Sequence, residues 1–270
     1  MLLVPGGGVP EAAAAVRGQV GDRPIVALGG GRVIDAAKAI GGADALRVAA
    51  VPTTLSGAEV TRIHRMPAGV DESNLIRPGL VIAAPELMAS QPMPQLAASA
   101  MNALAHGVEA LYHPGANPVS EMAALRAAEL FARGLSEPAN PRRDDLALGA
   151  LLAAWALGAT GYAIHHVVSQ TLVRVAGTPH AETNAVLLPH TVRFMAVRAG
   201  SAIEKLRKAI GGDVAHLSAA AGPTTLGELG VDPAKLDDVA AQAARRPELA
   251  NTPGGAPDRE RLRGLLEAAL

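Results

Sequence analysis

The stretch "ALGGGRVIDAAKAI", residues 27–40, joins an apolar segment to a helical pattern through three consecutive glycines. The apolar residues before the glycines are typical of a short buried strand, and the residues after them are typical of a helix. Glycine allows a tight turn, and the backbone N–H groups at a helix N-terminus can bind phosphate. The stretch therefore predicts a strand–turn–helix unit of an α/β fold, in which the glycines serve either turn geometry alone or phosphate binding.

Similar patterns surround this unit. A helical pattern precedes it at residues 9–20, and two further apolar runs follow, "LRVAAVPTT" at 46–54 and "GLVIAAPEL" at 79–87. Short continuous apolar strands between helices are typical of a parallel sheet covered on both faces. We therefore predict an α/β lobe over residues 1–85.

The remainder of the chain, residues 86–270, contains no strand pattern and is predicted to be an all-helical domain. We expect helices at residues 94–112, 118–135, 144–173, 180–197 and 257–270.

Composition limits the possible functions. The 270 residues are 49% hydrophobic but only 2% aromatic, so the core must consist mainly of Ala, Leu and Val. The net charge of −1 argues against a nucleic-acid partner. The absence of cysteine excludes disulfides, cysteine–zinc sites and thiol catalysis. The first residues lack the basic and long apolar segments of a signal peptide.

Residues 146–164 carry no charge and are nearly long enough to span a bilayer. They are mostly alanine and glycine, however, and weak hydrophobicity favours a buried helix of a helical domain. We therefore expect no membrane partner and a cytoplasmic protein.

A second polar turn follows the run at 46–54. Thr53, Thr54 and Ser56 provide hydroxyls at the expected carboxyl edge of the sheet, where ligands bind in open α/β folds. Together with Gly29, Gly30 and Gly31, they form a candidate phosphate site.

Histidines form the second candidate site. Asn102 and His106 are four residues apart and share one face of a predicted helix, with Glu109 a turn further along the same side. His166 and His180 could join His106 around a metal ion, although the neutral amide of Asn102 is a poorer ligand than a carboxylate. The alternative is that these histidines are hydrogen-bonded and packed in the core.

Several segments together resemble the iron-containing alcohol dehydrogenase family, and within it the maleylacetate reductases. The resemblance runs from near residue 9 to the C-terminus, and the segments that carry it are "GGGRVIDAAKAI", "VPTTLSGAEVT", "PGLVIAAPEL", "MNALAHGVEALYHPGANPVS", "HHVVSQTL" and "TPHAETNAVLLPH".

The resemblance implies a dehydroquinate synthase-like fold, with a partial Rossmann-like lobe for NAD(H) or NADP(H) and a helical domain, separated by a cleft. It also implies reduction of a ketone or of a maleylacetate-like vinylogous carbonyl by hydride transfer. In metal-dependent members an Asp and three His hold the ion, at positions that match Asn102, His106, His166 and His180.

The sequence departs from the family pattern at several positions. Asn102 replaces the metal-binding Asp, as in the maleylacetate reductase branch, which implies a metal-independent site. Gln170 replaces a histidine that relays a proton near the nicotinamide, and an amide cannot do this near neutral pH. Arg32 and Ala58 replace signature residues of the phosphate turns, where Arg32 could pair with a phosphate or block it.

The chain also starts late relative to the family. The first strands and a helix of family members supply the adenosine-ribose side of the cofactor site. We therefore expect weakened dinucleotide binding and an uncovered sheet edge that a partner subunit hides, so a homodimer is expected.

Three functions follow from these observations. The first is an NAD(P)H-dependent reductase of a small anionic carbonyl substrate, without metal. The second is a non-redox lyase, dehydratase or cyclase that uses the cleft histidines as acid and base. The third is a non-catalytic binding or assembly subunit.

The predicted site residues follow these hypotheses. They are His106, His165, His166 and His180 as catalytic residues; Gly29, Gly30, Gly31, Arg32, Asp35, Thr53, Thr54 and Ser56 for the cofactor; Asn102 and Gln170 for the substrate; and His106, His166 and His180 for any metal.

Overall fold

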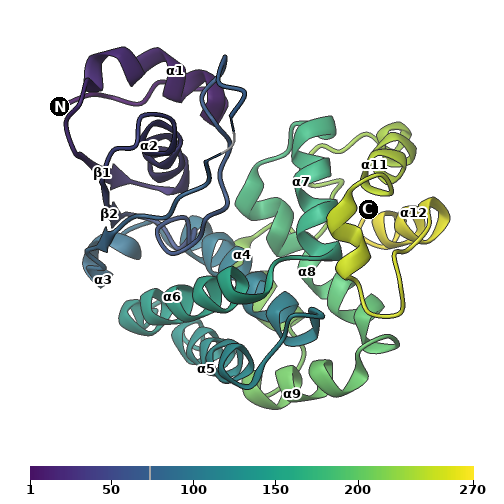
Figure 1. Cartoon of the computed structure of the whole chain (residues 1–270). Coiled ribbons are helices and arrows are strands. Elements are labelled where there is room, and N and C mark those ends of the chain that lie inside the picture. Colours follow the sequence, from purple (N-terminus) through teal and green to yellow (C-terminus); the bar gives the residue numbers. More distant parts are fainter. Residues whose placement is uncertain (73) are drawn as a thin grey trace. The chain divides into compact units, whose positions relative to one another are not determined.

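The computed structural model describes residues 1–72 and 74–270, and it consists of two compact units, Met1–Ser90 and Gln91–Leu270. The first unit is the expected α/β lobe and the second is helical, so the predicted fold class is confirmed (Figure 1). The boundary lies at Ser90 rather than at the predicted Pro85, because the first unit includes a short helix after the last strand.

The three predicted strands form one parallel sheet in the order β1-β2-β3. Helix α2 packs its apolar side on β1 and β2, and helix α1 packs on α2. The elements of this unit are α1 (Val9–Val20), β1 (Ile25–Gly29), α2 (Gly31–Ala43), β2 (Val48–Pro52), β3 (Leu80–Val81) and α3 (Pro85–Met88).

The expectation that both faces of the sheet are covered is wrong. Alternate side chains of a strand point to opposite faces, and Ala27 is buried against α2. Its neighbours Val26 and Leu28 point the other way and are 69% and 60% exposed. Apolar composition alone cannot reveal which face a helix covers.

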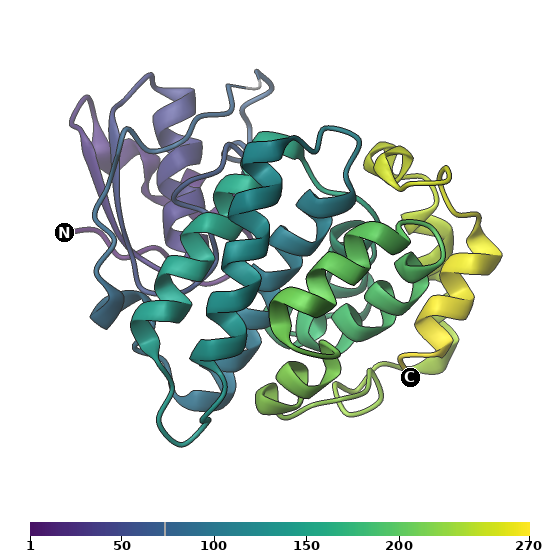
Figure 2. The same cartoon turned by 90° about the horizontal axis from the view of Figure 1, so that it is seen from below.

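The second unit has helices α4 (Met93–Tyr112), α5 (Pro118–Gly134) and α6 (Arg143–Thr160) packed side by side (Figure 2). Small residues allow this close packing: a Cβ added at Gly107 of α4 would lie 3.5 Å from the backbone oxygen of Ala124 in α5. The unit continues with α7 (Ile164–Ala176), α8 (His180–Ala196), α9 (Gly200–Ile210), α10 (Ala215–Ser218), α11 (Leu236–Ala243), α12 (Arg259–Glu267), and short 3₁₀ turns at Ala219–Ala221, Pro233–Lys235 and Pro247–Asn251.

One predicted helix, residues 144–173, is wrong as a single element. The chain breaks at Gly161, whose φ of +106° is a conformation that favours glycine, and α6 and α7 meet at 102°. Within the described residues no single helix is long and apolar enough to cross a membrane. The bent pair α6 and α7 passes that test by length and composition only.

Candidate active site

Helix α4 carries the first group of predicted site residues. Its residues from Leu96 to its end are all buried, and Asn102, His106 and Glu109 lie on successive turns of this buried helix. Asn102 Oδ1 and His106 Nδ1 have no hydrogen-bond partner among the described residues. Buried polar atoms without partners are uncommon in folded proteins and are candidate ligand contacts.

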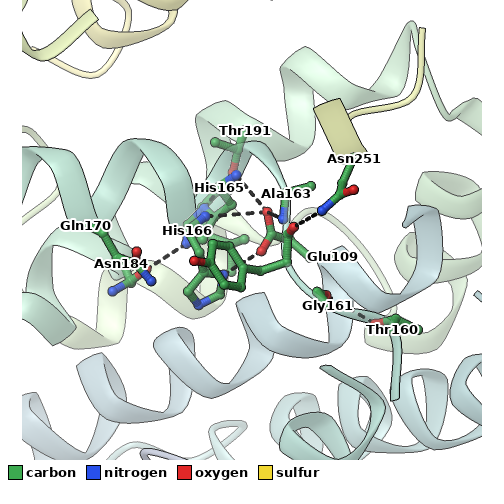
Figure 3. Close-up of polar contacts among 12 residues, drawn as sticks. Glu109, Thr160, Gly161, Ala163, His165, His166, Gln170, Asn184, Thr191 and Asn251 are labelled. Carbon is green, nitrogen blue, oxygen red and sulfur yellow. Dashed lines mark hydrogen bonds and ion pairs between the residues drawn. The ribbon is translucent and has the colours of Figure 1, made fainter. Parts of the chain in front are cut away.

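Glu109 organises the start of α7, which follows the break at Gly161. Its Oε1 accepts hydrogen bonds from the backbone N–H groups of Ala163 (3.1 Å) and His165 (2.7 Å), as Figure 3 shows. A helix start leaves N–H groups without partners, so a carboxylate there stabilises the helix. The break therefore places His165 and His166 in the first turn of α7 and directly against α4.

His166 contacts Glu109 and His106. Its Nδ1 lies 2.5 Å from Glu109 Oε2, and its ring stacks on the His106 ring with centroids 4.8 Å apart and planes at 21°. Nε2 of His166 is buried and has no partner among the described residues. The structure thus brings His106 and His166 together, as predicted from the sequence.

His165 is a packed core residue. Its Nδ1 lies 2.9 Å from Thr191 Oγ1 and its Nε2 lies 2.9 Å from Asn184 Oδ1, so both ring nitrogens are occupied (Figure 3). The residue has no exposed surface, and burial lowers its pKa to about 3. These contacts argue against the predicted catalytic role of His165.

His180 is the first residue of α8. It is exposed, whereas His106, His165 and His166 are buried. Asn184 connects it to His165, since the amide nitrogen of Asn184 lies 3.4 Å from His180 Nε2. Positive charge on His180 would lower the pKa of His106 and His166, so the three rings lie within electrostatic range of one another.

The buried rings are uncharged near neutral pH. Burial lowers the pKa of His106 well below its usual range, and burial together with the nearby His180 lowers the pKa of His166 to about 3. Neutral imidazoles cannot supply the positive charge that an anionic substrate requires.

A cation lies beside this cluster. Arg246 donates from Nη2 to Tyr162 Oη (3.0 Å) and to Gln170 Oε1 (3.1 Å), and from Nε to Glu248 (3.0 Å). The Tyr162 ring meets His166 edge-on at 6.1 Å, and the Arg246 side chain is 19% exposed. Arg246 and Tyr162 were not predictable as site residues, because no spacing in the sequence connects them to the histidines.

The histidine cluster fits a metal ion poorly. Among the described residues, no group of three His, Asp or Glu side chains is placed to hold one. His106 and His166 stack nearly parallel, and the remaining candidate ligand on α4 is the neutral amide of Asn102.

The glycine turn in the first unit allows the loop after β2 to approach the backbone at the start of α2 closely. A Cβ at Gly30 would lie 3.0 Å from Thr54 Cγ2, and a Cβ at Gly31 would lie 2.9 Å from Ser56 Oγ. The structure therefore brings the two predicted phosphate turns together. Thr54 Oγ1 is buried and lacks a partner among the described residues. Thr53 donates its backbone N–H to Gly29 O (3.0 Å).

Other predicted cofactor residues have protein partners. Arg32 is exposed and donates to the Pro5 carbonyl (2.7 Å), whereas Asp35 pairs with Lys38 (2.8 Å). Lys38 has no exposed surface and also donates to the carbonyls of Ala58 and Ile63. It therefore joins α2 to the loop after β2, a role that its place in a helical pattern did not reveal.

The chain belongs to the Fe-containing alcohol dehydrogenase family, whose C-terminal model matches residues 96–270. Its relatives within this family include proteins named as maleylacetate reductases, which confirms the resemblance. Maleylacetate reductase 1 of Rhodococcus opacus is 38% identical over 240 residues, which cover 83% of this chain and 67% of that protein. Maleylacetate reductase of Sphingobium indicum is 35% identical over 213 residues, which cover 75% of this chain and 60% of that protein.

Solved structures of maleylacetate reductases have the same fold as this chain. Maleylacetate reductase from Agrobacterium tumefaciens superposes with a TM-score of 0.82 at 33% identity, over 96% of this chain and 77% of that chain. The chain thus spans about 60% of the length of some curated relatives that it matches. The comparisons do not support the non-redox alternative, since these relatives are named as reductases.

Proposed function

We propose that this protein is an NAD(P)H-dependent reductase of a small anionic carbonyl compound of the maleylacetate type. The observation that carries the proposal is a set of buried polar atoms without partners among the described residues: those of His106 and His166, whose rings stack, and that of Asn102, one turn from His106 on α4. The names of the relatives support the reaction class.

The glycine turn and the hydroxyl turn fit the phosphates of a dinucleotide. Gly30 and Gly31 allow a phosphate to approach the backbone at the start of α2, and Thr54 offers a hydroxyl without a partner among the described residues. When bound, the cofactor supplies the hydride that is added to the carbonyl carbon.

Arg246 is the proposed contact for the negative charge of the substrate. The buried histidines are neutral, whereas the guanidinium stays charged at all accessible pH values. Nη1 of Arg246 makes no hydrogen bond with the described residues, so it can donate to a carboxylate. Gln170, which accepts from the same guanidinium, lies beside this contact.

Reduction also requires a proton on the carbonyl oxygen. Gln170 cannot supply it, and we assign this role to His180, the exposed ring of the cluster, because an imidazole can hold and release a proton near neutral pH. The poor fit of the cluster to a metal supports a metal-independent reaction. A cytoplasmic location and a homodimer complete the proposal.

Titration of the purified chain with NADH and NADPH, followed by nicotinamide fluorescence, tests the cofactor. Saturable binding is expected, and the absence of binding at millimolar cofactor would refute the proposal. In steady-state assays with maleylacetate, His180→Ala should lower kcat about a hundredfold or more. The exposed His216→Ala is the control and should retain full activity.

A further inference from the structure

We propose that Glu109 is a positioning residue that fixes the tautomer of His166 and thereby keeps the lone pair of His166 Nε2 available to a ligand. This inference rests on the proposed function, because it concerns how the same cluster meets its substrate.

The contacts of the carboxylate determine which atoms carry protons. Burial raises the pKa of Glu109, and the backbone N–H groups of Ala163, His165 and His166, which all face Oε1, oppose this rise by favouring the ionised carboxylate. An ionised carboxylate only accepts hydrogen bonds. The 2.5 Å contact with Oε2 therefore requires the hydrogen of the neutral His166 ring to be on Nδ1.

The other ring nitrogen then has a free lone pair. The hydrogen bond at one nitrogen of a histidine sets the role of the other. His166 Nε2 is buried without a partner in the described part of the chain. A ligand that meets this atom must present a donor, such as the hydroxyl of an alcohol product or of an enol, rather than a bare carbonyl oxygen.

Glu109 has a second role that an experiment must separate from the first. Its Oε1 caps the start of α7, so removal of the side chain would disturb the helix as well as the ring. Glu109→Gln separates the two roles. The amide oxygen can still accept from the backbone, while the amide NH₂ replaces Oε2 and donates to His166 Nδ1, which transfers the ring hydrogen to Nε2.

Tyr112→Phe is the matched control. The Tyr112 hydroxyl donates to the same carboxylate at Oε1 (3.4 Å), and its loss leaves the contact between Oε2 and His166 intact. Both variants change a hydrogen bond of the side chain at position 109, but only Glu109→Gln should change the tautomer of His166.

The test is long-range ¹H–¹⁵N NMR of the full chain labelled with ¹⁵N-histidine, with the His166 signals assigned by their loss in His166→Gln. In the wild type and in Tyr112→Phe, Nδ1 of His166 should be protonated and Nε2 unprotonated. In Glu109→Gln, Nε2 should be protonated and Nδ1 unprotonated. The kcat for NADH-dependent reduction should fall at least about tenfold in Glu109→Gln and remain within about twofold in Tyr112→Phe.

Three results would overturn the inference: Nε2–H in the wild type, an unchanged tautomer in Glu109→Gln, or a reversed tautomer with full activity. If Glu109→Gln fails to fold, the wild-type pattern decides alone. A chain without reductase activity would refute the proposed function, while the tautomer in Glu109→Gln would still decide whether Glu109 sets the ring.

Discussion

In the candidate site, Arg246 supplies positive charge, whereas the buried histidines supply neutral hydrogen-bonding groups. His106, His165 and His166 are neutral because burial disfavours their charged forms. The guanidinium of Arg246 remains charged beside them and is held in place by Tyr162 and Glu248. We therefore expect the negative charge of the substrate to bind at Arg246.

Arg246→Met should lower kcat/KM for a dicarboxylate substrate about tenfold to a hundredfold, because a charged hydrogen bond contributes about 1.5–3 kcal/mol. The kcat/KM for an uncharged aldehyde of similar size should change less than about threefold. Steady-state kinetics with both substrates measure the difference. The exposed neighbour Arg245→Met is the control, and equal losses for both substrates would contradict the assignment.

Glu59 lies in the loop after β2, and neither of its carboxylate oxygens has a partner among the described residues. Burial raises its pKa from 4.5 to about 7. Between these two pH values the unfolded chain loses the proton while the folded chain keeps it. Glu59 therefore destabilises the fold progressively as the pH rises from 4.5 to 7, and most above pH 7.

Glu59→Gln should remove this dependence. The free energy of unfolding of the wild type should fall by about 3 kcal/mol more than that of the variant between pH 4.5 and pH 8, since each unit of pKa corresponds to about 1.4 kcal/mol. Urea unfolding at both pH values measures it. Glu260→Gln, at an exposed position, is the control; an equal pH dependence in wild type and Glu59→Gln would contradict the expectation.

At the scale of single elements, the break between α6 and α7 decides where the histidines lie. A continuous helix through residues 144–173 would carry His165 and His166 away from Glu109. Gly161 permits the break, since a Cβ there would lie 3.0 Å from His113 Nε2 in addition to the strain of its positive φ.

Gly161→Ala should lower the free energy of unfolding by about 2 kcal/mol or more, through backbone strain and the contact with His113. Thermal or urea unfolding measures the change. Gly264→Ala is the matched control, because its added Cβ in the exposed middle of α12 meets no atom of the described residues within 4 Å, and a gain of about 0.5–1 kcal/mol is expected. Equal effects in both variants would show that the geometry of the break is not important.

Most elements with a strong apolar period were predictable. The predicted helix at 94–112 corresponds to α4, and the one at 180–197 corresponds to α8. Helices α9 and α11 were missed, although both carry an apolar face on Ile203 and Leu206 or on Val239 and Ala243. The break at Gly161 was hidden because alanine and glycine extend a helical pattern without interruption.

At the scale of the whole molecule, the sheet face that carries Val26 and Leu28 is the largest departure from expectation. Both side chains are mostly exposed, and β1 is an edge strand of the described sheet. Exposed apolar side chains beside an unpaired strand favour association.

We expect light scattering after size-exclusion chromatography to give twice the chain mass for the wild type. Val26→Ser with Leu28→Ser should shift the mass toward that of the monomer without changing the circular dichroism spectrum. The control is Val197→Ser, which alters a residue that is 93% exposed in the helical unit. A dimer that persists in the double variant would exclude this face as the contact.

Local patterns in the sequence were sufficient for the α/β lobe, the helical domain and the positions of Asn102, His106, His166 and His180, because strand and helix periods and turn glycines act over a few residues. The state of each histidine was not predictable in this way. His165 and His166 are adjacent in the chain, yet both ring nitrogens of His165 are hydrogen-bonded, to Thr191 and Asn184. His166 instead keeps one nitrogen, Nε2, that has no partner in the described part of the chain. Burial and hydrogen bonds from distant helices set these states, and such contacts exist only once α4, α7 and α8 have packed.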